Sequence, residues 1–430
     1  MTSKKIVQNL MSSRVCILGG GRIPFQPSGT VYKNYSNYDL TKTALYGLLK
    51  KTKVNPKEID NVLIGNVIQE VKTSNVAREA ALGVGIPDNV PAHTISQACI
   101  SSAQCVTTGV NSILANQANL VVAGGVETFS DVPIRYPKVM RKWLIDSQKE
   151  FKKGKSATLK HVMKLRTKYF IPDPPAISNY TTGEIMGVTS EVIAERFGIT
   201  REDMDSFTIR SHNNANNAHV CGLYDNEIFP VNQNKVENNV RANMKMEDLA
   251  KLRTSFKKNG THTAANSTGL SDGASACLIS SEEKANQLGI KPMAYIRASV
   301  FVGTDPFQEM LLGPAYAINK LFQGLDISLN DVDVFEIHEA FAGQILANIA
   351  ALNNNTFCQN NFNKDKVGEV PMDKLNLWGG SLAIGHPLAA SNIRNIMTAV
   401  NRLHHEDKEY ALVAACADSG LANAMLIQKN

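Results

Sequence analysis

The sequence lacks closely paired cysteines and long apolar runs. Its seven cysteines are odd in number, scattered and never spaced C-x-x-C, which argues against both a disulfide framework and a zinc site. We therefore expect a protein of a reducing compartment that holds no metal. No apolar stretch approaches the roughly 20 residues that cross a bilayer, so an integral membrane protein is not expected.

The N-terminus lacks acidic residues, the first of which is Asp39. Basic residues such as Lys4 and Arg14 lie there among serines and apolar residues, a composition that weakly resembles a mitochondrial transit peptide. It predicts a targeting leader over residues 1–13, although a disordered N-terminus explains the same composition equally well. The C-terminal residues 427–430 carry no peroxisomal tripeptide.

Basic charge is concentrated in residues 135–168, here called the basic insertion. This segment holds twelve Lys and Arg against two acids, so the rest of the chain, with 33 bases and 37 acids, is mildly acidic although the whole carries a formal charge of +6. Trp143, Leu144 and Phe151 lie among the lysines, which is typical of an amphipathic helix on an anionic membrane surface. A solvated basic loop is the simpler alternative. No nucleic-acid partner is expected, because no known binding motif accompanies the charge.

Short apolar strands alternate with helical patterns in two stretches of the chain. With 430 residues, 43% of them hydrophobic, the chain exceeds one core, so two or three packed units are expected. Strands separated by helices predict an α/β fold of βαβ units, with a parallel or mixed sheet covered on both faces. The predicted units are an N-terminal half over residues 14–129 completed by 258–283, a C-terminal half over 284–430, and an inserted domain over 130–257. The inserted domain is predicted to be mainly helical, because 190–197 and 201–215 keep helical periodicity.

Two distant segments place a reactive side chain between an extended lead-in and a helix. In the first, Cys99 precedes a helical stretch, and a thiol at a helix N-terminus gains thiolate character from the macrodipole. In the second, His386 lies at a turn before Pro387, which fixes the ring and suits a base that accepts a thiol proton. Cys416, at the end of a later buried strand, is a candidate second acid or base. Each residue alone has a structural explanation, but together the segments hold what thiolate chemistry needs if they face each other.

His338 begins the run His-Glu-Ala-Phe between an apolar strand and a helix. A side-chain donor at the carboxyl end of a strand suits the stabilisation of an oxyanion. The neighbouring Glu339 is equally explained as a helix-start residue that faces the positive end of the dipole. The sequence thus offers one further candidate for the site.

These segments resemble the motifs of the thiolase family, in that family's order. Residues 98–101 (Ala-Cys-Ile-Ser) resemble its nucleophile motif, and 338–341 (His-Glu-Ala-Phe), 385–387 (Gly-His-Pro) and the Cys416 loop follow. The resemblance covers nearly the whole chain. It implies a thiolase-like fold of duplicated βαβ halves in a five-layered αβαβα core, with a loop domain that covers coenzyme A.

Within the family, the chain resembles a mitochondrial branch of β subunits. Residues 65–79 and 124–135 carry this closer resemblance, and His338, where many relatives have Asn, fits it as well. Members of that branch are associated with the mitochondrial inner membrane and act with a hydratase/dehydrogenase α subunit. The resemblance therefore implies a homodimer held in such a complex, with the basic insertion as the surface that contacts an anionic membrane.

The resemblance also implies catalytic roles. Cys99 would attack the 3-keto carbon of a 3-ketoacyl-CoA, and His386 would activate it. Cys416 would protonate the departing acetyl-CoA enolate and later deprotonate the incoming CoA thiol. His338 and His386 would form one oxyanion hole, and backbone amides at Cys99 and around Asp418 would form another.

Three further residues match loops that lie near the acyl and pantetheine parts of the substrate in the family. They are Met186, Ser267 and Thr268. The resemblance implies 3-ketoacyl-CoA and CoA as the molecules bound there. Coenzyme A is then a co-substrate, and no separate cofactor is expected.

The chain departs from the family pattern at two positions. Asn392 follows the His386 turn where a glycine-containing run is usual, and we expect a mild change because Asn tolerates a left-handed backbone. Asp418 replaces a small residue. If its carboxylate points inward it would raise the pKa of both thiols and oppose an oxyanion, whereas if it points outward its amide can still serve.

The sequence therefore predicts a 3-ketoacyl-CoA thiolase of fatty acid β-oxidation, located in the mitochondrial matrix or at the inner membrane. One alternative is a short-chain acetoacetyl-CoA thiolase that runs in the condensing direction. The other is a low-activity or non-catalytic scaffold subunit with the thiolase fold, which Asp418 and Asn392 favour. Chain-length preference and the acylation of Cys99 separate the three.

Overall fold

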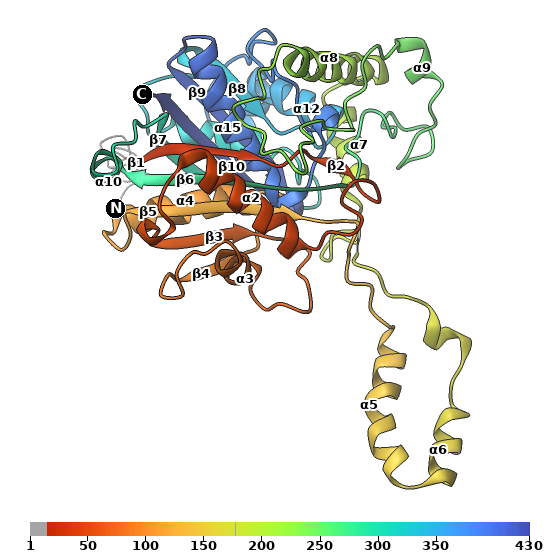
Figure 1. Ribbon diagram of the computed structural model, residues 1–430. Helices are drawn as coiled ribbons and strands as arrows, with labels where there is room; N and C mark the ends of the chain where they lie inside the picture. Colours follow the sequence, from red (N-terminus) through yellow and green to blue (C-terminus); the bar gives the residue numbers. More distant parts are fainter. Residues whose placement is uncertain (1–14, 177) are drawn as a thin grey trace.

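The computed structural model describes residues 15–176 and 178–430, so the predicted leader over 1–13 lies outside the described residues. Its strands form one mixed sheet in the order β4-β3-β5-β6-β1-β7-β10-β9-β8, and β2 pairs with β6 beside this path (Figure 1). The strands are β1 (Val15–Arg22), β2 (Gln26–Pro27), β3 (Asn61–Gly65), β4 (Ala92–Ile95), β5 (Leu120–Glu127), β6 (Ser271–Ser281), β7 (Ala294–Gly303), β8 (Val334–Ile337), β9 (Tyr410–Ala417) and β10 (Leu421–Lys429).

The helices lie between these strands and in the inserted region. They are α2 (Asn37–Thr52), α3 (Val76–Gly83), α4 (Ser101–Leu114), α5 (Lys138–Lys152), α6 (Lys155–Val162), α7 (Met186–Arg196), α8 (Arg201–Val220), α9 (Met246–Ala250), α10 (Glu282–Gln287), α11 (Gly313–Phe322), α12 (Ala342–Leu352), α13 (Asn355–Phe362), α14 (Ser381–Ile384) and α15 (Ser391–His405). None of these described helices combines the length and the apolar character that a membrane span requires.

The sheet repeats one topology in two halves. In the first half, β3 is parallel to β5, which is followed by antiparallel β6 and β1. In the second, β8 is parallel to β9, which is followed by antiparallel β10 and β7. The halves join where Cys16 and Ile17 of β1 pair with Tyr295 and Ala294 of β7. Because this seam is only two residue pairs long, the two half-sheets can face each other across it.

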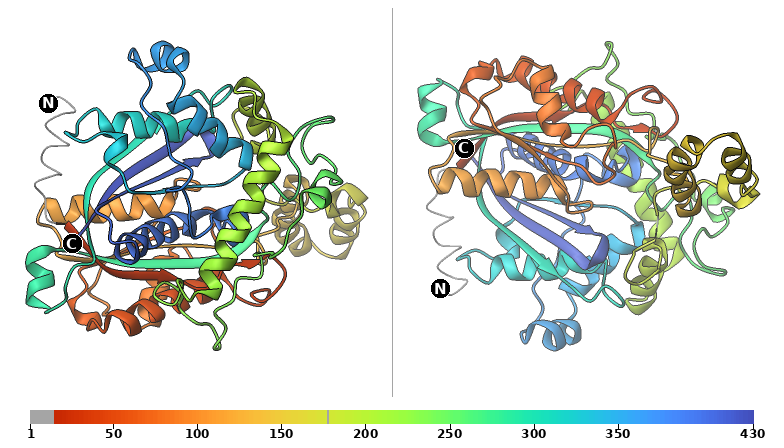
Figure 2. Two further views of the ribbon diagram at one scale, coloured as in Figure 1. Left: turned by 90° about the horizontal axis from the view of Figure 1, so that it is seen from above. Right: turned by 90° about the horizontal axis from the view of Figure 1, so that it is seen from below.

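Two helices fill the space between the half-sheets. Val106 and Val110 of α4 and Met397 and Val400 of α15 belong to one apolar cluster, which also contains residues from β5, β6, β9 and β10. Figure 2 shows α4 and α15 side by side between the two sets of strands. Helices α2 and α3 cover the outer face of the first half, and α11 and α12 cover that of the second. The five layers confirm the predicted thiolase-like α/β fold.

A close backbone contact at β5 brings the two halves together near the start of α15. A Cβ placed on Gly125 would lie 2.1 Å from the carbonyl oxygen of Ala389, in the short helical turn just before α15. Only a residue without a side chain allows this approach. Glycine in β5 therefore lets the turn that follows His386 pack directly onto the strand that follows α4.

The region between β5 and β6 contains mainly helices, as predicted. Helix α8 begins with a capping box, in which Thr200 and Asp203 each bond the other's backbone N–H. The basic insertion contains α5 and α6 and projects away from the body of the molecule (Figure 1). Its two helices are held together by Trp143 and His161, whose rings stack at 4.7 Å. The predicted domain boundaries remain predictions.

Candidate active site

Cys99 lies at a strained turn just before α4. The preceding Ala98 has a φ of +46°, a left-handed conformation that residues with a Cβ rarely adopt. Ser101 holds this turn, because its hydroxyl accepts a hydrogen bond from the N–H of Gln97 at 2.8 Å and donates one to the Ala98 carbonyl at 2.7 Å. The thiol is thereby fixed at the mouth of the helix, and Cys99 is only 4% exposed.

Burial dominates the acidity of Cys99. It raises the pKa of the thiol to about 12, although the backbone N–H of Asp418 favours the thiolate. The expectation that the helix N-terminus makes Cys99 a thiolate is therefore wrong. The group is a thiol at neutral pH, so it needs a base that removes its proton as it attacks.

Asn392 connects the second half of the molecule to Cys99. Its side-chain amide is buried and donates a hydrogen bond to the carbonyl oxygen of Cys99 at 2.8 Å. Asn392 lies in the first turn of α15 with an ordinary helical backbone, so the explanation by a left-handed conformation is wrong. The side chain instead fixes the carbonyl of the nucleophile's own peptide group.

Cys416 and Asp418 approach Cys99 from the end of β9. Cys99 packs in one apolar cluster with Ala415 and Ala417, the residues on either side of Cys416. The pKa of the Cys416 thiol is raised first by burial and then by its proximity to Cys99. Asp418 directs its carboxylate to Asn179, whose amide donates to Oδ1 at 2.9 Å. The carboxylate raises the pKa of Cys99, but less than the Asp418 amide lowers it. Each of the two alternatives for Asp418 is thus partly right: its carboxylate raises the pKa of Cys99, and its backbone amide still favours the thiolate.

His386 and His338 form a pair of buried rings in the second half. Their centroids lie 4.2 Å apart, and each Nε2 is buried without a hydrogen-bond partner among the described residues. Burial, and then the charge of Arg394, lowers the pKa of His386 to about 3. Burial, His386 and Arg394 together hold the pKa of His338 well below its usual range. Both rings are therefore neutral at pH 7, as a base and a neutral hydrogen-bond donor require.

Three polar residues that the sequence analysis missed hold these rings. Ser391 Oγ lies 2.7 Å from Nδ1 of His386, and Ser381 Oγ lies 3.0 Å from Nδ1 of His338. Arg394 donates to Ser381 Oγ at 2.8 Å. The available signal was the spacing of 391 and 394, which puts both on one face of a helix that starts directly after the His386 turn.

Glu339 has a structural role beside the two histidines. Its buried carboxylate accepts hydrogen bonds from Ser211 of α8 and from the amide of Asn376, each at 2.7 Å. The helix-start explanation is wrong, because α12 begins at Ala342 and has no acidic residue in its first turn. Glu339 instead ties the inserted region to the strand end that carries His338.

The predicted substrate-contacting residues lie beside the same segments. Ser267 pairs with Phe341, and the N–H of Thr268 donates to Ala340 at 3.1 Å, so these two residues adjoin the His-Glu-Ala-Phe run. The hydroxyl of Ser267 is buried without a partner among the described residues. Met186, at the start of α7, packs against the apolar cluster that contains Cys416. Ser267 and Thr268 thus lie beside the segment that carries His338, and the binding roles of all three residues remain predictions.

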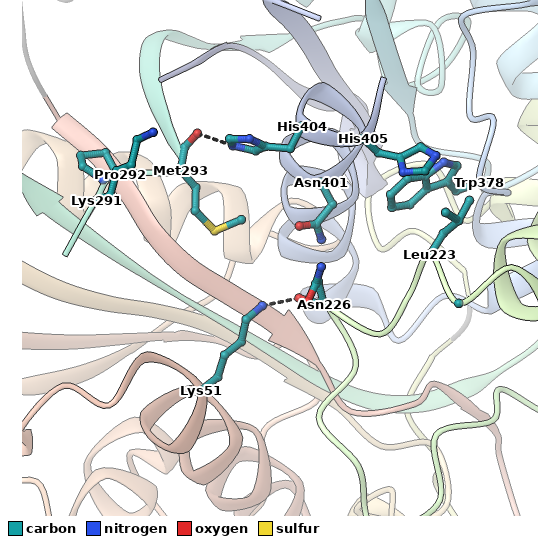
Figure 3. A pocket seen from close by; sticks show the side chains of 11 residues that line it. Lys51, Leu223, Asn226, Lys291, Pro292, Met293, Trp378, Asn401, His404 and His405 are labelled. Atoms are coloured by element: carbon teal, nitrogen blue, oxygen red, sulfur yellow. Dashed lines mark hydrogen bonds between the residues drawn. The ribbon is translucent and has the colours of Figure 1, made fainter. Parts of the chain in front are cut away.

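A separate cavity of about 580 Å³ lies elsewhere, lined by the end of α15, by Lys51 of α2 and by loops of the inserted region and of the second half (Figure 3). His404 Nε2 contacts the Met293 carbonyl at 2.8 Å at its edge, and Trp378 and His405 meet edge to face. None of its lining residues is a predicted site residue. The arrangement of reactive groups therefore identifies the candidate site, and the presence of a cavity does not.

The assembled site contains two buried thiols and two buried neutral imidazoles. The described residues hold no group of three or more His, Cys, Asp or Glu side chains placed to bind a metal ion. Thiols beside a base and beside hydrogen-bond donors suit the formation and cleavage of a thioester. The arrangement can therefore perform acyl transfer through a covalent intermediate.

Comparisons with known proteins agree with this chemistry. The chain is 45% identical to the mitochondrial trifunctional enzyme subunit beta of Bos taurus, over 99% of this chain and 90% of that protein. It is 44% identical to a probable 3-ketoacyl-CoA thiolase of Caenorhabditis elegans, over 96% of this chain and 94% of that protein. The crystal structure of human mitochondrial 3-ketoacyl-CoA thiolase in complex with CoA is similar, with a TM-score of 0.83, 29% identity and coverage of 98% of this chain and 99% of that one.

Two family profiles match almost the whole described chain. Residues 15–283 match the thiolase N-terminal domain. Residues 290–429 match the thiolase C-terminal domain. The two matches meet between β6 and β7, close to the seam that joins the half-sheets. Together with the fold and the site, they establish that this chain belongs to the thiolase family.

Proposed function

We propose that the protein is a 3-ketoacyl-CoA thiolase (acetyl-CoA C-acyltransferase) of fatty acid β-oxidation. The observation that carries the proposal is that Cys99 packs against the residues on either side of Cys416 and against Leu388, next to the paired rings of His386 and His338, in a chain whose relatives bear that name. The reaction transfers an acyl group from a 3-ketoacyl-CoA to CoA and releases acetyl-CoA. CoA is a substrate in this scheme, and no further cofactor is invoked.

In the first half-reaction, the sulfur of Cys99 attacks the 3-keto carbon while Nε2 of His386 takes the thiol proton. The backbone amides at Cys99 and around Asp418 stabilise the resulting oxyanion on the 3-keto oxygen. The bond between C2 and C3 then breaks, and its electron pair forms the enolate of acetyl-CoA, whose thioester oxygen lies in the oxyanion hole of His338 and His386. Cys416 protonates this enolate at C2, which leaves an acyl thioester on Cys99 and a thiolate on Cys416.

In the second half-reaction, the Cys416 thiolate takes the proton of the incoming CoA thiol. The CoA sulfur attacks the acyl thioester, and the backbone amides at Cys99 and around Asp418 again stabilise the oxyanion, because this oxygen is the former 3-keto oxygen. The thioester bond to Cys99 breaks, and the sulfur of Cys99 regains the proton held by His386. Met186, Ser267 and Thr268 contact the acyl and pantetheine parts of the substrate.

The proposed setting is the mitochondrion, with the protein as a homodimer bound to a hydratase/dehydrogenase α subunit. Support comes from the relatives named mitochondrial trifunctional enzyme subunit beta. The matrix and the inner-membrane surface are the two submitochondrial locations that this setting allows. Co-purification with an α subunit tests the partner, and sedimentation equilibrium tests the dimer.

The basic insertion is proposed to contact an anionic membrane surface. Ile145, Phe151 and Leu159 are exposed apolar side chains on its two helices, and they lie among the lysines. Charge reversal at Lys142 and Lys160 should abolish sedimentation with anionic vesicles and leave the weaker binding to neutral vesicles unchanged. Reversal of two exposed lysines elsewhere in the chain is the control, and equal binding by both variants contradicts the proposal.

A thiolysis assay with 3-ketoacyl-CoA substrates of increasing chain length tests the function. Activity on long chains that Cys99→Ala abolishes is the expected result. A strong preference for acetoacetyl-CoA favours the short-chain condensing enzyme instead. No turnover and no acylation of Cys99 in a folded protein favours the non-catalytic scaffold.

A further inference from the structure

The hydrogen bonds around His338 determine which nitrogen of its ring carries the proton. A neutral imidazole has one N–H and one lone pair, so it donates from only one of its two nitrogens. Nε2 of His338 is buried and has no partner among the described residues. Nδ1 lies 3.0 Å from the hydroxyl oxygen of Ser381. Only the tautomer with the proton on Nε2 can donate a hydrogen bond into the site.

Ser381 is itself constrained by Arg394. The guanidinium donates to Ser381 Oγ at 2.8 Å, and an arginine can only donate. The hydroxyl therefore accepts from Arg394, and its own proton needs an acceptor. With the ring proton on Nε2, Nδ1 of His338 is that acceptor. With the ring proton on Nδ1, the oxygen would accept twice and the hydroxyl proton would have no partner among the described residues, so the contacts favour the tautomer with the proton on Nε2.

Arg394 lies beside a buried glutamate. Its Nη1 lies 3.7 Å from Glu336 Oε2, and Arg402 donates to the other oxygen of Glu336 at 2.9 Å. All three side chains are almost fully buried. The charge of Arg394 also disfavours protonation of His338. The ring therefore stays neutral, and its single N–H proton lies on one of the two nitrogens.

We propose that Ser381 and Arg394 are positioning residues that hold His338 as the Nε2–H tautomer. In this form the ring donates to the thioester oxygen of the 3-ketoacyl-CoA and to the enolate oxygen that develops there. The role rests on the proposed thiolase function, whereas the tautomer itself does not. An asparagine at position 338 would present an N–H whatever its neighbours do, and a histidine requires this control.

The kinetic test is a double-mutant cycle. Ser381→Ala should lower kcat three- to tenfold with KM nearly unchanged, because the donor acts most strongly in the transition state. In a His338→Asn background the same change should alter kcat less than twofold, since the amide needs no tautomer control. Ser381→Thr should restore the rate. Ser280→Ala, a buried serine that bonds Asn119 at 3.0 Å, is the matched control.

The spectroscopic test needs no variant other than one used for assignment. In protein labelled with ¹⁵N-histidine, the signal lost in His338→Asn should show a proton on Nε2 and none on Nδ1. A proton on Nδ1, or equal loss of kcat in both backgrounds of the cycle, overturns the proposal. If the protein lacks thiolase activity, the spectrum still decides the tautomer, so the two proposals fail separately.

Discussion

In the first half of the molecule the backbone positions the reactive group. Cys99 follows a left-handed Ala98, and Ser101 closes the turn. In the second half side chains position the reactive groups, because Ser381 and Ser391 contact Nδ1 of His338 and of His386, respectively. The turn before Cys99 and the contact between His386 and Ser391 occur near the starts of the two central helices, α4 in one half and α15 in the other.

The difference teaches how a repeated fold divides one reaction. A nucleophile needs a fixed direction of approach, which a strained turn provides. A base and a neutral donor need a fixed protonation state as well, which requires hydrogen-bond partners and a dry environment. The predictions below remove one contribution at a time from either half.

The largest effect should come from the base in the second half. His386→Asn removes the group that accepts the Cys99 proton, and because burial raises the pKa of that thiol to about 12, no spontaneous thiolate replaces it. We expect kcat to fall by about 10² to 10⁴, measured in single-turnover acylation. A loss below tenfold would mean that another group activates Cys99.

The same variant should change the pH dependence of stability. Folded His386 has a pKa of about 3 and the unfolded side chain about 6.5, so between these values the unfolded state binds one proton more and acidification destabilises the fold. Between pH 6 and 5 the unfolding free energy of the wild type should fall by about 1 kcal/mol more than that of His386→Asn. Denaturant unfolding at both pH values measures it, and parallel losses contradict a neutral buried ring.

The contact between the halves should have an intermediate effect. Asn392→Ala removes the donor to the Cys99 carbonyl and should cost about 1 to 2 kcal/mol in unfolding free energy, with a loss of about tenfold in kcat. Asn395→Ala is a matched control, because Asn395 is buried on the same helix and its amide has no partner among the described residues. If both variants behave alike, the bond to Cys99 does not position the nucleophile.

The smallest effect should come from the charge of Asp418. Asp418→Asn keeps an oxygen that can accept from Asn179 and removes a carboxylate that raises the pKa of Cys99. Alkylation of Cys99 by iodoacetamide at pH 8 should become about two- to fivefold faster. The same substitution at an exposed position, Asp373→Asn, is the control. A slower reaction would show that the amide of Asp418 moved with its side chain.

The sequence was sufficient to predict most of the fold, and it offered the four residues that are proposed to react. Apolar strands alternating with helices identified both halves, and the turn residues around Cys99 and His386 marked the two helix starts. These features are local, so periodicity and turn chemistry report them. The resemblance to the thiolase family supplied the five-layered order and the expected roles.

The sequence was insufficient for properties that depend on distance. The pKa of Cys99 was predicted to fall and is raised, because a helix dipole is a local effect and burial is a tertiary one. Asn392 was explained by its backbone, whereas its amide acts on a residue 293 positions away. Ser381 and Arg394 were missed for the same reason, since they contact His338 and Glu336 at the end of β8, far from them in the sequence.

The most direct test of the account is mass spectrometry of the protein after brief exposure to a 3-ketoacyl-CoA without free CoA. The account predicts an acyl group of the shortened chain on the peptide that contains Cys99, and none on that peptide in Cys99→Ala. An acyl group on another cysteine, or no adduct in a folded protein, would contradict it.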